Sequence, residues 1–137
     1  MISRQKRTFQ SGSRRAVAAV EFAVCLPILT LVVFGSIEMS HGIFAKQAGT
    51  AAAYEAARLA TSTGGTEIAA RQRADEVLNA MNIDGGTVQI TPEVNATMSR
   101  GTVVTVTVQI PSELNSGGLN FIMPPRQITT SIAMVKL

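Results

Sequence analysis

RRAVAAVEFAVCLPILTLVVFGSIEMS, residues Arg14 to Ser40, decides how this 137-residue chain is organised. The 22 residues from Ala16 to Ile37 carry a single charged side chain, Glu21. At 1.5 Å per residue, a helix of this length reaches about 33 Å, close to the ~30 Å hydrocarbon thickness of a bilayer. We therefore predict one transmembrane helix. Pro27 is compatible with it, because a proline bends a membrane helix more often than it ends one.

The excess positive charge of the chain is confined to its N-terminal end. Five of the twelve Lys and Arg residues lie before Ala16, and no acid accompanies them. Beyond that point, seven basic residues are outnumbered by nine acidic ones. A short basic tail beside an apolar run marks the cytoplasmic flank, so the chain after the span is expected outside the cytoplasm. A nucleic-acid partner is not expected, because such a partner needs basic residues gathered on one folded face.

A cleaved secretory signal is the main alternative interpretation of the apolar stretch. The apolar core of such a signal usually has about 7–15 residues and precedes a small-x-small cleavage site. Here the run Phe22–Ile37 is slightly longer, and Glu-Met-Ser-His-Gly follows it. Cys25 is the only cysteine, so an intramolecular disulfide is impossible and cysteine usage does not indicate the compartment.

The helix is expected to continue beyond the membrane, because Glu38–Thr61 has no proline and is rich in alanine. Small residues recur at a spacing of seven along it: Gly35, Gly42, Gly49 and Ala56. This spacing keeps them on one stripe, where another helix can approach closely. Each glycine costs about 1 kcal/mol relative to alanine inside a helix, which favours a packing role. An alanine-rich helix whose glycines fall into register by chance is the alternative.

The remainder of the chain predicts a small α+β head. TSTGGT (61–66) ends the long helix, and Thr66 can cap a second helix from Glu67 to about Asn82. A period of two then predicts three or four antiparallel strands: Thr87–Thr91, a weaker Glu93–Met98, Thr102–Ile110 after a hairpin turn, and Gln127–Val135. Their apolar face must pack on helix, either the second helix or the outer half of the long one.

Catalytic and cofactor motifs are absent from the sequence. It has no phosphate-binding glycine loop, no Cys/His spacing for a metal and no GxSxG elbow. His41, the only histidine, is expected to be a surface or helix-contact residue. We therefore predict a protein that is not an enzyme and needs no cofactor or metal.

Glu21 requires an explanation, because a carboxylate in hydrocarbon costs several kcal/mol unless it is paired. It could reach back to the headgroups or pair with Arg14 or Arg15. The pattern around it, however, resembles the N-terminal signal of class III prepilins: basic residues, a small residue, four apolar residues, Glu-Phe and an apolar run with a proline. More specifically, Arg14–Thr61 resembles the TadE-like family, small pseudopilin-type proteins of tight-adherence (Flp) pilus systems. The likeness includes the VEFA, LP, FG and YEAAR segments.

The resemblance implies roles for particular residues. A prepilin peptidase would cut between Ala16 and Val17, making Glu21 the fifth residue of the mature chain. The residue before the cut is usually glycine, whereas this chain has Ala16. In pilins the acid pairs with the free amino group of a neighbouring subunit, so leader removal would create the counter-charge. Glu21 and the stripe of Gly35, Gly42 and Gly49 would then mediate contacts with other pilin or pseudopilin subunits.

We therefore expect a TadE-like minor pseudopilin of pilin-like architecture that takes part in pilus assembly or secretion. Its four segments are a cytoplasmic leader (1–16), a transmembrane helix (17–37), an extension of that helix (38–61) and a periplasmic head (62–137). It would cross the bacterial inner membrane once, with a prepilin peptidase and the pilus assembly platform as further partners. An unprocessed envelope anchor for a non-pilus complex and a secreted binding protein are the alternatives.

Overall fold

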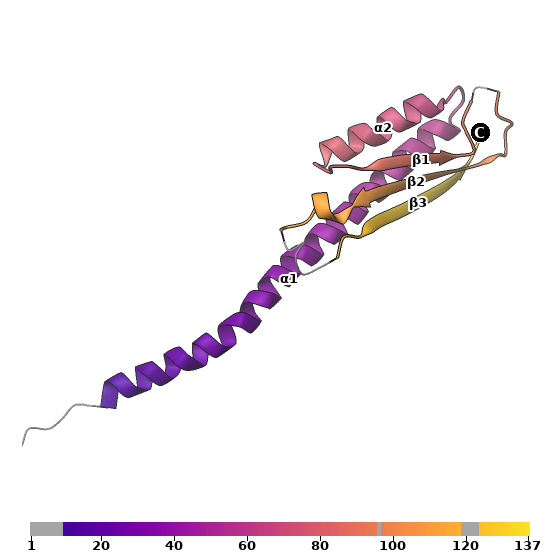
Figure 1. The fold of residues 1–137 in the computed structure, drawn as a ribbon. Coiled ribbons are helices and arrows are strands. Elements are labelled where there is room, and N and C mark those ends of the chain that lie inside the picture. Colours follow the sequence, from indigo (N-terminus) through magenta and orange to yellow (C-terminus); the bar gives the residue numbers. More distant parts are fainter. Residues whose placement is uncertain (1–9, 96, 119–123) are drawn as a thin grey trace, which may run out of the picture. The chain divides into compact units, whose positions relative to one another are not determined.

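The computed structural model describes residues 10–95, 97–118 and 124–137 (Figure 1). Residues 1–9 of the predicted leader lie outside them. The elements, in chain order, are α1 (Gln10–Thr61), α2 (Glu67–Ala80), β1 (Thr87–Thr91), β2 (Val103–Pro111), a 3-10 helix η1 (Ser112–Leu114) and β3 (Gln127–Val135). The chain forms two compact units, one ending at Ser36 and one running from Ile37 to Leu137. We call the second one the head unit.

Helix α1 contains 52 residues and includes Pro27. The long helix that the sequence predicts is confirmed, and it begins before Ala16, at Gln10. Its end follows from the turn TSTGGT, where Gly64 has a φ of +77°. A Cβ on Gly65 would lie 2.1 Å from the carbonyl oxygen of Leu59, so that position has no room for a side chain. Glycine therefore ends α1 where the sequence indicates.

Helix α2 begins at the predicted cap. The backbone N–H of Ala69 donates to Oγ1 of Thr66 at 3.3 Å, and Glu67 occupies the first turn, where the helix dipole favours an acid. Ala70, Ala74 and Leu78 are buried, and their spacing of four residues places them on one face of the helix. The helix ends at Ala80, slightly before the predicted end near Asn82.

The sheet has three antiparallel strands in the order β1–β2–β3. In the central strand, Val106 pairs with Ile90 on one side and with Ile132 on the other. The apolar residues of β2 that alternate along the strand are fully buried: Val104, Val106, Val108 and Ile110. The strands predicted at Thr87–Thr91, Thr102–Ile110 and Gln127–Val135 are therefore confirmed, to within one residue.

The weaker strand predicted for Glu93–Met98 is wrong. Its described residues form no strand, and Ala96 lies outside the description. The side chain of Val94 is 5% exposed, and its carbonyl oxygen accepts from the N–H of Glu67 at 3.2 Å. The carbonyl oxygen of Val94 therefore accepts its hydrogen bond from the first residue of α2 and not from a neighbouring strand. The segment that connects β1 to its antiparallel neighbour β2 is consequently a loop that contains turns.

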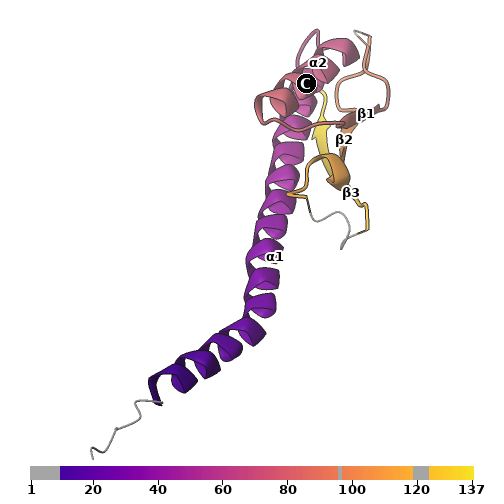
Figure 2. The ribbon, with the colours of Figure 1, turned by 60° about the vertical axis from the view of Figure 1, so that its left-hand side comes forward.

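Both helices cover the apolar face of the sheet, so both predicted candidates are confirmed. Figures 1 and 2 show α2 and the outer part of α1 on the same side of the strands. The buried residues of these two helices are almost all alanines: Ala45, Ala48, Ala52, Ala53, Ala56, Ala57, Ala60, Ala70 and Ala74, with Leu78. Their small side chains let the helix backbones lie close to the sheet, which supplies the largest fully buried side chains of the core.

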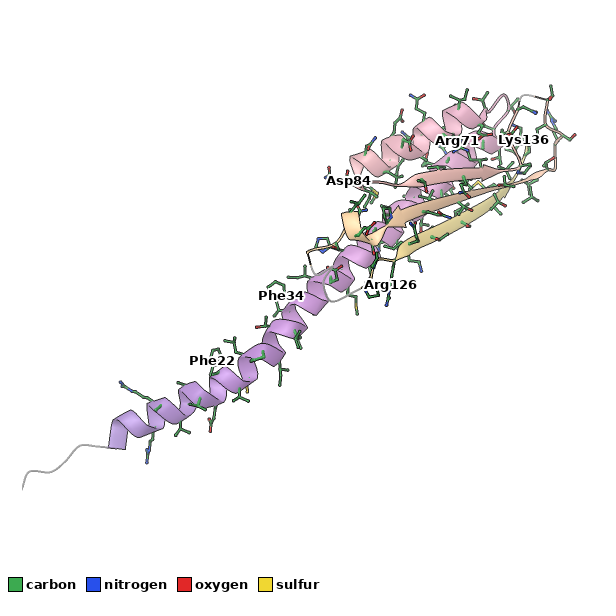
Figure 3. All side chains as sticks on the ribbon, in the orientation of Figure 1. Phe22, Phe34, Arg71, Asp84, Arg126 and Lys136 are labelled. Carbon is green, nitrogen blue, oxygen red and sulfur yellow. The ribbon has the colours of Figure 1, made fainter. Side chains whose placement is uncertain are left out.

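The C-terminal end of the chain is tied to the C-terminal end of α1. Lys136, labelled in Figure 3, is only 5% exposed. Its Nζ donates to the carbonyl oxygens of Ala60 at 3.0 Å and Ser62 at 2.9 Å. The N–H of Leu137 donates to the carbonyl oxygen of Thr61 at 3.1 Å. The C-terminus of a helix has carbonyl groups without hydrogen-bond partners and carries a partial negative charge. A buried ammonium group donates hydrogen bonds to these carbonyl groups and compensates the charge.

Candidate functional site

The first unit exposes the apolar side chains of α1. Phe22 is 60% exposed and Leu31 is 63% exposed, and Figure 3 shows Phe22 and Phe34 extending from the helix. In the described part of the chain, α1 is the one helix long and apolar enough to cross a membrane, and its most apolar stretch is not buried. A lipid bilayer supplies the apolar surroundings that such a surface needs.

Glu21 lies on this exposed part of α1 without a partner among the described residues. The ion pairs of the described chain all lie in the head unit. Arg14 and Arg15, the partners that the sequence left open, are exposed and do not pair with it. Inside hydrocarbon the acid then needs a counter-charge that the described chain does not provide.

The predicted cleavage position, between Ala16 and Val17, lies within α1, about two turns after the helix begins at Gln10. Both residues are exposed. Val17 precedes Glu21 by four residues, which corresponds to about 6 Å along the helix axis. An amino group created at Val17 would therefore lie about one helical turn from the level of the carboxylate.

The glycines of the stripe differ in what surrounds them. A Cβ on Gly49 would lie 3.1 Å from Cδ1 of Ile110 and 3.4 Å from Oγ1 of Thr130, so α1 packs tightly on β2 and β3 at this point. Gly35 and Gly42 have nothing within 4 Å of the same position. Packing within the chain accounts for a glycine at position 49. Contact with another subunit stays a prediction for Gly35 and Gly42.

Glu38 and His41 contact residues of their own head unit. Oε2 of Glu38 accepts from the N–H of Gly117 at 3.0 Å. Nδ1 of His41 lies 2.9 Å from the carbonyl oxygen of Ile37, which can only accept, so Nδ1 donates. His41 is exposed and its ring contacts its own helix, in agreement with the prediction of a surface or helix-contact residue. The contact of Glu38 was not predicted, because it joins residues 79 positions apart, and only the glycine pair at 117 and 118 signals a close approach there.

The paired charges of the head unit lie on the surfaces of α1 and α2, and one of these pairs joins the two helices. Glu55 accepts a hydrogen bond from Arg58 at 2.8 Å and lies 3.6 Å from Nε of Arg73, which also pairs with Glu76. The hydrogen bond from Arg58 lowers the pKa of Glu55, and the same contact raises the pKa of Arg58. Solvent screens such pairs. Among the described residues, no three His, Cys, Asp or Glu side chains come together as metal ligands would.

Residues 16–58 match the family model described as TadE-like protein. This segment is TadE-like. No curated protein and no solved structure matches the chain. The resemblance found in the sequence is thus confirmed for residues 16–58.

The TadE-like segment lies entirely within α1. It includes Glu21 and the glycines of the stripe, and it ends at Arg58, three residues before the end of the helix. Neither α2 nor the sheet belongs to it. The matched part of the chain is therefore the exposed apolar stretch of α1 together with almost all of the part of α1 that belongs to the head unit.

Proposed function

We propose that this chain is a TadE-like minor pseudopilin that takes part in the assembly of a tight-adherence pilus or in secretion by its machinery. The observation that supports this most directly is the coincidence of the TadE-like match with an exposed apolar helix whose acid, Glu21, lacks a described partner. The protein acts through contacts with other subunits and not through catalysis. Residues 1–16 form a cytoplasmic leader, residues 17–37 cross the inner membrane, and the sheet and α2 lie in the periplasm.

Leader removal provides the counter-charge for Glu21. A prepilin peptidase cuts between Ala16 and Val17 and leaves an ammonium group on Val17. Because Val17 and Glu21 differ by about 6 Å along the axis, a neighbouring helix displaced by one turn brings its carboxylate level with this ammonium group. Pairing removes the several kcal/mol that an isolated charge costs in hydrocarbon. The acid thereby favours one axial register between subunits.

Gly35 and Gly42 provide the surface on which a neighbouring helix packs. They lie two helical turns apart on one stripe, and neither has an atom within 4 Å of the position that a Cβ would occupy. Without large side chains, two helix backbones can approach closely, which is how helices associate in a membrane. The partner is another pilin or pseudopilin subunit, held at the pilus assembly platform.

The role of Glu21 is tested by Glu21→Ala, with Glu21→Asp as the matched control. The alanine variant should insert into the membrane normally but lose incorporation into pili and co-purification with partner pilins. The aspartate variant retains the charge and should keep part of both. Unchanged piliation in Glu21→Ala would contradict the pairing.

Processing is tested by the intact mass of the chain purified from the native bacterium. The expected N-terminus is Val17, and Ala16→Arg should leave the leader attached, whereas Ser13→Arg adds the same charge away from the cut and should be processed. Met1 still attached to a fully active protein would instead support an unprocessed envelope anchor. A soluble product that begins after Ile37 would support a secreted protein.

A further inference from the structure

The loop between β2 and β3 reaches α1 at the residue where the apolar run ends. Gly117 donates its N–H to Glu38 at 3.0 Å. A Cβ on Gly117 would lie 3.3 Å from Cγ2 of Ile37 and 3.2 Å from Nδ1 of His41. Ile37 is the last residue of the uncharged apolar run and belongs to the head unit. Ile37 and this loop belong to the same compact unit, so the position of the loop along the axis of α1 can be compared with the end of the apolar run.

Along the axis of α1, the distance from Ile37 to this loop is no larger than the thickness of a lipid headgroup layer. His41 follows Ile37 by four residues, or about 6 Å along the axis. The polar layer on each side of a bilayer is about 5–8 Å thick, from the difference between its total and hydrocarbon thickness. With the hydrocarbon ending at Ile37, Gly117 is therefore level with the lipid headgroups.

The same end of the head unit carries an exposed apolar side chain and an exposed cation. Leu114 is 59% exposed and lines a cavity of about 300 Å³ together with His41 and Phe44. Arg126 is exposed, and its backbone is joined to Ser112 by hydrogen bonds of 2.8 and 2.9 Å. No ion pair holds its guanidinium among the described residues. Figure 3 shows Arg126 at the start of β3, where this loop ends.

We propose that Leu114, Gly117 and Arg126, which we call the head base, lie in the lipid headgroup layer and form a second membrane contact. Leu114 places its exposed apolar side chain among the headgroups, and the guanidinium of Arg126 binds lipid phosphate, whose paired oxygens match its planar donors. The bond from Gly117 to Glu38 holds this loop at the required depth. The proposal rests on the proposed membrane span, and it adds that the head unit lies on the bilayer surface.

The test measures depth in the bilayer with spin labels on the full chain in vesicles of phosphatidylethanolamine and phosphatidylglycerol. One label is placed on the native Cys25. Two others, on a Cys25→Ser background, are placed at Leu114→Cys and at Ser99→Cys, an exposed site at the opposite end of the strands. Accessibility to oxygen, which concentrates in lipid, is compared with accessibility to a water-soluble nickel complex.

The oxygen-to-nickel ratio at position 114 should fall between the high value at Cys25 and the low value at Ser99. Arg126→Gln should shift the value at 114 toward that at 99, and replacing both lipids by phosphatidylcholine should not, since its phosphate remains. A value at 114 equal to that at 99, with Cys25 deep, overturns the head base alone. Low access to both reagents at 114 overturns it in favour of a protein contact. A water-exposed Cys25 overturns the membrane span itself.

Discussion

Replacing Lys136 by methionine tests whether the end of the chain stabilises the head unit by capping α1. Methionine keeps the apolar stem but removes Nζ, which donates at 3.0 Å to Ala60 and at 2.9 Å to Ser62. Hydrogen bonds from a charged donor contribute about 1.5–3 kcal/mol each, and the charge at the helix C-terminus adds about 0.3–1 kcal/mol. Because burying the ammonium group offsets part of this gain, we expect a loss of about 2–3 kcal/mol. For a unit of this size, that lowers the melting temperature by about 10–20 °C.

The assay is thermal unfolding of the full chain in detergent micelles, followed by circular dichroism and by hydrogen exchange of the β2 amides. Lys46→Met is the matched control, because Lys46 is exposed on the same helix and its loss should change stability by less than about 0.5 kcal/mol. If both variants unfold at the same temperature, the contacts of Lys136 do not stabilise the head unit and the reasoning is refuted.

Three further substitutions probe packing and charge in the head unit, each read by thermal unfolding. Gly49→Val forces a side chain against Ile110 and should cost about 1–3 kcal/mol, whereas Gly42→Ala meets nothing within 4 Å and should stabilise the isolated chain by up to about 1 kcal/mol. Equal effects at the two positions would contradict the observed packing. Thr130→Val removes a buried hydroxyl that lacks a hydrogen-bond partner in the described structure, so stability should be unchanged or higher, and a clear loss would reveal a partner. The hydrogen bond from Arg58 lowers the pKa of Glu55 below 4.5, so the stability that this pair contributes is present above pH 4.5 and is lost as the pH falls through the lowered pKa. Glu55→Gln should remove that acid-dependent loss, and an NMR titration of the Glu55 carboxyl carbon gives the direction of the shift directly.

The sequence predicts most of the fold because the signals involved are local. Alternation of valine with threonine and glutamine identifies β2, and the capping hydroxyl of Thr66 and the glycines of TSTGGT mark helix ends. These features act through neighbouring backbone groups, so they can be read without the tertiary structure. The prediction of a strand at Glu93–Met98 fails because the carbonyl group of Val94 forms its hydrogen bond with Glu67. These two residues are far apart in the sequence, so a local pattern does not show that they meet.

For the candidate site, the sequence alone determined that one acid, Glu21, lies in an apolar helix and that small residues recur every seven positions. Only the tertiary structure decided which of these residues are available to another molecule. Gly49 is covered by β2 and β3, whereas Gly35 and Gly42 are open, although the three are equivalent in the pattern. Likewise, Lys136 caps α1 across 76 residues, and Gly117 joins Glu38 across 79. Such contacts depend on how the sheet packs on the helix, and no periodicity within a single element records that packing.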